Sequence, residues 1–306
     1  MPGNQLAERS CQTENVPATF LVVPQWQGSG SSRAMQLSDG ADAIAGDLPA
    51  AVTRRVEVPL GAGESLDTGV HRASSIRMIR DAVAAALGAD SDEGEGEPGV
   101  VVTIGGDCGV ELAPVARAVG QHPELAVVWL DAHADLSTPD ESPSGAFSGM
   151  VLRTLLGDGP ELLVPAAGET LTASRVVLAG TRSYGDDEEA FIEEKAIRLV
   201  TVDQLQHSED LERGDALVAA VESTGATSVY LHVDLDVLDP AEIAGISYPE
   251  PFGLTVAALV ENITAVRRRF TLVGAGITQF APSSPDTAAD DLSAVLRIIS
   301  ALTRPL

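Results

Sequence analysis

Short apolar runs alternate with longer amphipathic stretches along most of the chain. The runs are rich in Val, Ile and Leu and are bounded by polar residues, which predicts strands at 19–23, 55–60, 100–104, 127–130, 175–179, 197–201, 228–236 and 271–279. The stretches between them repeat apolar side chains at helical spacing, as Ile76, Ile79, Val83 and Leu87 do. Strands that are apolar on both faces indicate a parallel sheet covered by helices. The pattern therefore predicts an α/β fold, a three-layer α/β/α arrangement around an eight-stranded, mainly parallel sheet.

The alternation keeps one rhythm from residue 18 to the last predicted helix at 286–302. We therefore expect a single domain over residues 18–306, preceded by a flexible N-terminal tail at residues 1–17. The acidic, glycine-rich stretch at residues 90–98 predicts a surface loop inside this domain, because strand and helix signals continue unchanged on both sides of it.

Composition narrows the classes of function. Lys and Arg total 19 against 45 Asp and Glu, which gives a formal net charge of −26. Such a chain offers no basic surface for nucleic acid or for an anionic membrane, so we expect neither as a partner. Its two cysteines, Cys11 and Cys108, are not expected to pair, and the sequence has neither a signal-peptide pattern nor a membrane-spanning apolar run. These features predict a cytoplasmic protein.

The apolar run at 127–130 ends abruptly at Asp131, and His133 and Asp135 occupy the next alternate positions. Alternate side chains of an extended chain point the same way, so these three are expected to converge. Two carboxylates and an imidazole at one place are typical ligands of a divalent metal. An exposed acidic turn with a chance histidine is the weaker alternative, because two further candidate groups occur in the chain.

A second acidic pair lies at the end of the run at 228–236. Asp234 and Asp236 alternate in the same way, and two buried neighbouring carboxylates are costly unless a cation neutralises them. Asp239, just before a proline, fits a turn or helix-capping acid instead. His232 is predicted on the same face as Asp234 but deeper, which favours a hydrogen bond to a metal ligand, or a satisfied core histidine, over direct metal binding.

Cys108 is the third candidate, because it follows the run at 100–104 and a Gly-Gly turn. A buried cysteine is usually a small hydrophobic side chain. Beside five carboxylate or imidazole groups, however, a metal-binding thiolate becomes reasonable. In an open parallel sheet, ligands bind beyond the carboxyl ends of the strands, which is where all three motifs are predicted.

Three segments resemble the metal-binding signatures of the ureohydrolases, the family of arginase, agmatinase and formimidoylglutamase. They are Gly-Gly-Asp-Cys at 105–108, Asp-Ala-His-Ala-Asp at 131–135 and Asp-Leu-Asp-Val-Leu-Asp-Pro at 234–240. The resemblance runs from about Val22 to the last helix. It implies an arginase-like fold, a small guanidino or amidino substrate, and two Mn²⁺ ions that share a hydroxide able to attack the guanidine or amidine carbon. It also implies a homo-oligomer, either a trimer or a hexamer.

The resemblance assigns a role to each metal ligand. The two bridging ligands would be Asp131 and Asp234. One metal would also be bound by Cys108 and Asp135, and the other by His133 and Asp236.

Three positions depart from the family pattern. Cys108 stands where the family usually has a histidine, and a soft, charged thiolate shifts metal preference toward Zn²⁺, Fe²⁺ or Co²⁺. Ser148 stands where the family has a loop histidine thought to deliver protons to the leaving amine, and serine does not titrate near neutrality. Gln279 stands where arginases carry a glutamate facing the guanidinium, and it lacks the negative charge. The candidate catalytic residues are Asp135, Ser148 and Gln279.

The substrate-binding positions also differ from those of arginase. The two asparagines that hold the substrate carboxylate in arginase fall at Ser137 and Ala146, and Ser144 is the position that is kept. The candidate substrate contacts are therefore Ser137, Ser144 and Gln279. An uncharged glutamine cannot balance a buried guanidinium, so we expect a substrate less basic than arginine, such as an N-hydroxyguanidine or a formimidoyl compound.

Two functions from different classes remain open. The first is a metal-dependent hydrolase of a linear C–N bond, which the intact acidic and imidazole ligands favour. The second is a catalytically weakened relative that binds a metal or another ligand, which Ser148 and Gln279 favour. Other enzyme classes fit less well: Ser148 is not in a Gly-x-Ser-x-Gly motif. Gly274 and Gly276 lack the third glycine of a dinucleotide-binding motif and fit close strand packing better.

Overall fold

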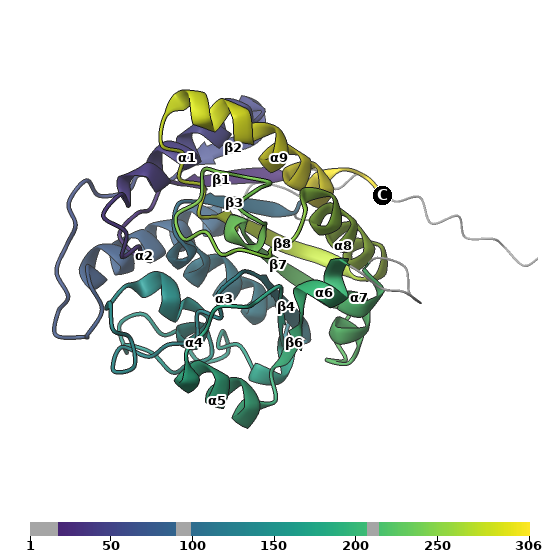
Figure 1. Cartoon of the computed structure of the whole chain (residues 1–306). Helices are drawn as coiled ribbons and strands as arrows, with labels where there is room; N and C mark the ends of the chain where they lie inside the picture. Colours follow the sequence, from purple (N-terminus) through teal and green to yellow (C-terminus); the bar gives the residue numbers. More distant parts are fainter. Residues whose placement is uncertain (1–17, 90–98, 207–213) are drawn as a thin grey trace, which may run out of the picture.

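The structure, a computed structural model, describes residues 18–89, 99–206 and 214–306. These residues form one eight-stranded sheet in which every neighbouring pair of strands is parallel (Figure 1). The strand order is β2-β1-β3-β8-β7-β4-β5-β6. The sheet is thus wholly parallel where the sequence predicted a mainly parallel one. The predicted tail at 1–17 and the predicted loop at 90–98 lie outside the described residues.

The strands correspond to the predicted apolar runs. They are β1 (Thr19–Val23), β2 (Thr53–Arg55), β3 (Val101–Gly105), β4 (Leu125–Leu130), β5 (Val176–Ala179), β6 (Arg198–Val200), β7 (Ser228–Asp234) and β8 (Thr271–Thr278). The prediction of a strand at 55–60 was wrong in its bounds, since β2 ends where that run begins. Beyond it, the Val56 N–H still donates to the Val22 carbonyl at 2.9 Å. Pro59 has no N–H with which to continue the edge ladder.

Helices follow most of the strands. They are α1 (Met35–Gly46), α2 (Ala73–Ala89), α3 (Leu112–Gln121), α4 (Val151–Leu155), α5 (Asp186–Lys195), α6 (Val202–Gln206), α7 (Asp215–Glu222), α8 (Val256–Arg269) and α9 (Pro285–Thr303). The sequence did not predict α4 and α6, because five residues are too few to show a helical period.

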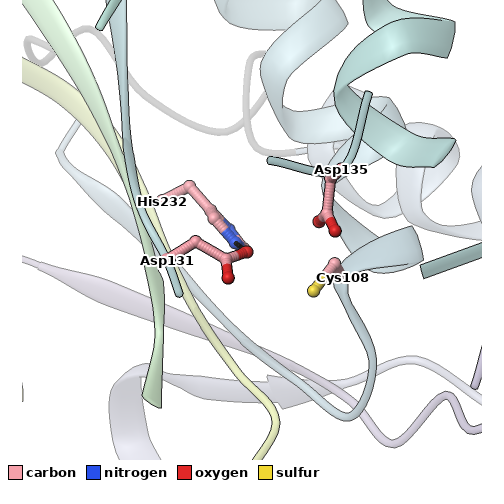
Figure 2. A group of neighbouring side chains, drawn as sticks. All are labelled: Cys108, Asp131, Asp135 and His232. Atoms are coloured by element: carbon pink, nitrogen blue, oxygen red, sulfur yellow. Dashed lines mark ion pairs between the residues drawn. The ribbon is translucent and has the colours of Figure 1, made fainter. Parts of the chain in front are cut away.

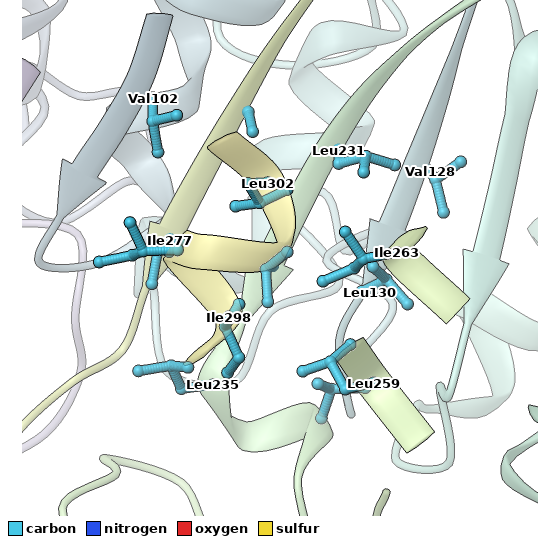
Figure 3. Close-up of a cluster of buried hydrophobic side chains, with 14 of the residues drawn as sticks. Val102, Val128, Leu130, Leu231, Leu235, Leu259, Ile263, Ile277, Ile298 and Leu302 are labelled. Atoms are coloured by element: carbon cyan, nitrogen blue, oxygen red, sulfur yellow. The ribbon is translucent and has the colours of Figure 1, made fainter. Parts of the chain in front are cut away.

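Alternate side chains of each strand enter two different hydrophobic cores. Val128 and Leu130 of β4 pack on the face covered by α1, α7, α8 and α9, where Leu259 and Ile263 meet them (Figure 3). The intervening Trp129 packs on the opposite face, among side chains of α2, α3, α4 and α5. The result is the predicted three-layer α/β/α arrangement, with the sheet between two helix layers.

The candidate residues follow the four central strands, whose order is β3-β8-β7-β4. Asp131 comes directly after β4, Asp234 ends β7 and Gln279 comes directly after β8. Cys108 opens a short 3₁₀ helix three residues beyond the end of β3. Because parallel strands share one carboxyl edge, these segments meet there. Within the described residues, no helix is both long enough and apolar enough to cross a membrane.

Candidate metal centre

One group of candidate ligands consists of Asp131, His133 and Asp236, whose ligand atoms lie within 4.8 Å of one another. His133 Nδ1 is 3.0 Å from Asp236 Oδ2 and 3.5 Å from Asp131 Oδ1. Backbone N–H groups orient both carboxylates. The His133 N–H donates to Asp131 Oδ1 at 2.6 Å, and the Ala132 N–H donates to Asp236 Oδ1 at 3.1 Å. The backbone of the loop after β4 therefore holds both carboxylates in place. This group is called the His133 side below.

A second group consists of Cys108, Asp131, Asp135 and His232, again with ligand atoms within 4.8 Å (Figure 2). Asp131 belongs to both groups, as its predicted bridging role requires. The Cys108 thiol donates to Asp234 Oδ2 at 2.9 Å, so Asp234 lies against this group as well. Cys108 and Asp135 define what is called the Cys108 side below. All six predicted metal ligands are thus together at the carboxyl edge of the sheet.

The pKa values of the carboxyl groups in this centre are shifted in opposite directions. Burial, together with the charges of Asp236 and Asp131, raises the pKa of Asp234 well above its usual range. Burial also raises the pKa of Asp135, and it raises that of Asp236 to about 6. For Asp131, burial acts in the same direction, but His133 and His232 outweigh it and lower the pKa.

The pKa values of the His133 imidazole and the Cys108 thiol are raised as well. Burial disfavours the charged form of His133, yet Asp131 and Asp236 raise its pKa to about 12. Burial and the neighbouring acids raise the pKa of the Cys108 thiol. The centre therefore contains more buried acid than its histidines can balance, and one oxygen of Asp135 has no hydrogen-bond partner among the described residues. A set of buried carboxyl groups, an imidazole and a thiol with this excess of acidic groups fits divalent cations, which can take the place of the protons.

Two of the candidate catalytic residues have a strained backbone conformation. Asp135 and Gln279 have φ angles of 54° and 66°, in the left-handed region that non-glycine residues rarely adopt. Such strain costs of the order of 1–3 kcal/mol and is found where the surroundings impose it, often at functional sites. The Gln279 N–H donates to the Gly106 carbonyl at 2.7 Å, which ties it to the loop that carries Cys108.

A cavity of about 340 Å³ opens onto the candidate ligands. Its lining includes the predicted substrate and catalytic side chains Ser137, Ser144, Ser148 and Gln279. Gln279 is 2% exposed, its Nε2 donates to Cys108 Sγ at 3.6 Å, and its Oε1 has no partner among the described residues. None of the described residues that line the cavity is a lysine or an arginine.

Tyr248 and Glu188 are among the residues that line this cavity without having been predicted. Tyr248 places its hydroxyl 3.4 Å from Ser29 Oγ, and no sequence signal marked it. Glu188 accepts the N–H groups of Leu136 at 2.9 Å and Gly185 at 3.0 Å, so it fixes the segment after Asp135. The glutamate three residues after Gly185 is a recognisable helix-capping pattern, and it could have marked Glu188.

Comparison with known sequences identifies relatives. A family model described as the arginase family matches residues 26–302. The arginase of Bacillus caldovelox is 32% identical over 208 residues, which cover 65% of this chain and 67% of that protein. The arginase of Staphylococcus aureus (strain MRSA252) is 32% identical over 154 residues, which cover 50% of this chain. This match covers 51% of the Staphylococcus aureus arginase, so the chain spans about half the length of that relative.

Comparison with solved structures gives the same fold. The native arginase structure from Bacillus caldovelox has a TM-score of 0.80 at 23% identity, covering 95% of this chain and 99% of that chain. The agmatine ureohydrolase of Thermoplasma volcanium has a TM-score of 0.67 at 18% identity, covering 94% and 90%. The formimidoylglutamase of Bacillus subtilis has a TM-score of 0.68 at 18% identity, covering 95% and 88%. The fold is the arginase-like α/β fold.

Proposed function

The chain belongs to the arginase family, and we propose that it is a metal-dependent hydrolase of a linear C–N bond in a guanidino or amidino compound. The observation that carries the proposal is the meeting of two ligand groups that share Asp131 at the floor of one cavity. Burying so many carboxyl groups without a cation lowers the stability of the fold, so a site that only bound a small molecule would not be expected to contain them.

We propose that two divalent cations bind here. Cys108 and Asp135 would hold one and His133 and Asp236 the other, with Asp131 and the remaining ligand, Asp234, shared between them. Mn²⁺ is the metal that the family suggests. The Cys108 thiol, which already contacts Asp234 at 2.9 Å, makes Zn²⁺, Fe²⁺ or Co²⁺ alternatives, because soft thiolate ligands favour these ions. When bound, such cations lower the pKa of water and stabilise negative charge at the carbon under attack.

Gln279 is proposed to orient the substrate. Its buried Oε1 has no hydrogen-bond partner among the described residues and can accept a hydrogen bond from a substrate N–H, while its Nε2 donates to Cys108 Sγ. A neutral amide gives a guanidinium a hydrogen bond but no counter-charge, and an unpaired buried charge costs several kcal/mol as an order of magnitude. The proposed substrate is therefore weakly basic, such as an N-hydroxyguanidine or a formimidoyl compound.

Three serines of the cavity offer polar, uncharged contacts to the substrate. Ser137 and Ser144 are proposed to bind the part of the substrate remote from the reacting carbon. Ser148, which is 8% exposed, supplies a hydroxyl in place of a titrating side chain. A weakly basic leaving group needs less help from an acid, so this loss is consistent with the proposed substrate.

A second candidate function is a catalytically weakened member of the family that retains metal or ligand binding. Ser148 and Gln279 favour it, because both positions have lost groups that can carry charge in the reaction.

We also propose, on family likeness, a homo-oligomer that is a trimer or a hexamer and a single domain over residues 18–306. A cytoplasmic location is proposed because Cys108 is a buried free thiol.

The test is metal analysis of the purified chain followed by a screen for urea or ammonia release. Arginine, agmatine, N-hydroxyarginine and formimidoylglutamate are compared after loading with Mn²⁺, Zn²⁺, Fe²⁺ or Co²⁺. The proposal expects bound metal and faster hydrolysis of the weakly basic compounds. Bound metal without hydrolysis of any guanidine or amidine would favour the weakened relative, and preference for arginine or agmatine would overturn the substrate assignment.

A further inference from the structure

A buried polar cluster lies beneath the candidate metal centre and is not used in the reaction proposed above. It consists of Glu111, Tyr230 and His232, which are 0%, 2% and 0% exposed. Glu111 ends the 3₁₀ helix that Cys108 begins, and Tyr230 and His232 occupy alternate positions of β7. The cluster is thus carried by two of the segments that supply the candidate metal ligands.

The cluster forms a row of contacts that ends at Asp131. The Tyr230 hydroxyl donates to Glu111 Oε2 at 2.6 Å. His232 Nδ1 lies 3.3 Å from Glu111 Oε1, and His232 Nε2 lies 3.7 Å from Asp131 Oδ2. Figure 2 shows the imidazole of His232 directed at the Asp131 carboxylate. The Trp129 indole N–H donates to the same Asp131 oxygen at 3.1 Å, and its ring stacks on His232 with 3.6 Å between centroids.

Strand β8 makes room for the cluster with two glycines. Gly274 and Gly276 are the cross-strand partners of Tyr230 and His232. A Cβ at Gly276 would lie 1.5 Å from Glu111 Oε1, and a Cβ at Gly274 would lie 2.7 Å from the Tyr230 ring. The sequence predicted these glycines to serve close strand packing. The structure adds that they accommodate buried polar side chains.

Packing alone does not account for the cluster. Glu111 Oε1 and both His232 nitrogens lack a hydrogen bond of good geometry with any described residue. Buried polar and charged groups are costly when imperfectly paired, and apolar side chains of similar volume would fill the same space without that cost. The candidate metal ligand that the cluster touches is Asp131, the residue shared by both ligand groups.

We propose that Glu111 and His232 are positioning residues for Asp131. One imidazole nitrogen of His232 faces the Glu111 carboxylate and the other faces an oxygen of Asp131, so that the cluster sets the orientation that Asp131 presents to both metal sites. This inference rests on the metal centre proposed above. Partners of this kind orient metal ligands in many metalloproteins, and their loss typically costs about 10- to 100-fold in metal affinity or activity.

Metal binding by the full chain tests the proposal, with Co²⁺ as the probe. Calorimetry measures affinity, and elemental analysis at saturation measures the number of ions. Glu111→Gln keeps the shape of the side chain without its charge, and His232→Phe keeps a ring against Trp129 without the nitrogens. We expect each variant to bind Co²⁺ about 10- to 100-fold more weakly with unchanged stoichiometry. Because both act through one contact, the loss in the double variant should be smaller than the product of the two single losses.

Two control variants separate positioning from general destabilisation. Tyr230→Phe removes one hydrogen bond to Glu111 and should weaken Co²⁺ binding by about fivefold, the equivalent of one ordinary hydrogen bond. Asn262→Ala removes a buried side chain of α8, which bonds the Leu205 and Ala258 carbonyls on the opposite face of the sheet. It should lower the unfolding temperature and leave Co²⁺ affinity unchanged.

Three outcomes would overturn the inference. Wild-type affinity in both Glu111→Gln and His232→Phe would remove the positioning role and leave the proposed hydrolase standing. Loss of one ion at saturation in His232→Phe would make His232 a direct ligand instead of a positioning residue. A wild-type chain that binds no Co²⁺, Mn²⁺ or Zn²⁺ would remove the metal centre, and both proposals with it.

Discussion

The two sides of the candidate metal centre differ in their exposure and in how their ligands are held. The His133 side chain is 29% exposed and contacts Asp236 at 3.0 Å, and both of its acidic neighbours accept backbone N–H groups. Cys108 and Asp135 are 2% and 4% exposed, and one oxygen of Asp135 has no hydrogen-bond partner in the described part of the chain. One side is therefore partly open and internally paired, and the other is closed and more dependent on a cation.

Two of the three departures from the family pattern lie on the Cys108 side. Cys108 itself is one, and the Gln279 amide donates to its sulfur at 3.6 Å. Ser148, the third departure, lines the cavity that both sides face. His133 and Asp236 keep the family residues. The comparison suggests that the His133 side supplies what the chain shares with arginases, and that its distinctive metal and substrate preferences arise on the Cys108 side.

Asp234 is the ligand proposed to join the two sides, so its loss is expected to have the largest effect. Asp234→Ala removes a proposed bridging ligand and should weaken binding of both metals by at least about 100-fold, since even partners outside the ligand set cost 10- to 100-fold. Elemental analysis after gel filtration measures this loss. Asp239→Ala is the matched control, because Asp239 accepts the Ala241 and Gly253 N–H groups and serves as a turn acid, as the sequence predicted. Full metal content in Asp234→Ala would refute the assignment.

Cys108 tests whether the closed side sets metal preference. Cys108→His restores the family ligand and should shift preference from Zn²⁺ or Co²⁺ toward Mn²⁺ by about 10- to 100-fold, because imidazole is neutral and less soft than thiolate. Competition between Mn²⁺ and Zn²⁺ followed by elemental analysis gives the ratio. A preference unchanged from that of the wild type would mean that the thiol does not bind metal.

Gln279 tests the charge of the substrate. Gln279→Glu restores a negative charge beside the reacting group and should raise the ratio of kcat/KM for arginine over N-hydroxyarginine by about tenfold, the equivalent of roughly 1.4 kcal/mol from a charged hydrogen bond. Gln279→Asn, which changes length without adding charge, is the control. Equal selectivity in the wild type and in Gln279→Glu would contradict the charge argument.

Ser148 is expected to give the smallest effect. Ser148→His replaces the missing proton donor, but its loop is held by the Ser148 N–H bond to the Gly28 carbonyl at 3.0 Å and was not shaped around an imidazole. We expect a gain in kcat of about tenfold for basic leaving groups, well below the 10²–10⁴ of a positioned acid. The dependence of kcat on leaving-group basicity is the measurement, and Ser148→Ala is the control. Equal gains for all leaving groups would exclude proton delivery.

The class of fold and most of the candidate centre could be predicted from the sequence alone. Runs that are apolar on both faces specify a buried parallel sheet, and acids placed at the ends of those runs specify an edge rich in ligands. Asp131, His133 and Asp135 were predictable together because residues two apart in extended chain share a face. These patterns are local in the sequence, so they do not depend on the order of the strands in the sheet.

Which distant side chains meet could not be predicted, because it depends on how the whole chain folds. The register of β7 against β8 places Tyr230 beside Gly274 and His232 beside Gly276, and this pairing opens the space that Glu111 occupies. Tyr248 also lines the cavity, although no sequence pattern indicated it. Strand order and register follow from the summed packing of many side chains far apart in the sequence, so no local pattern carries that information.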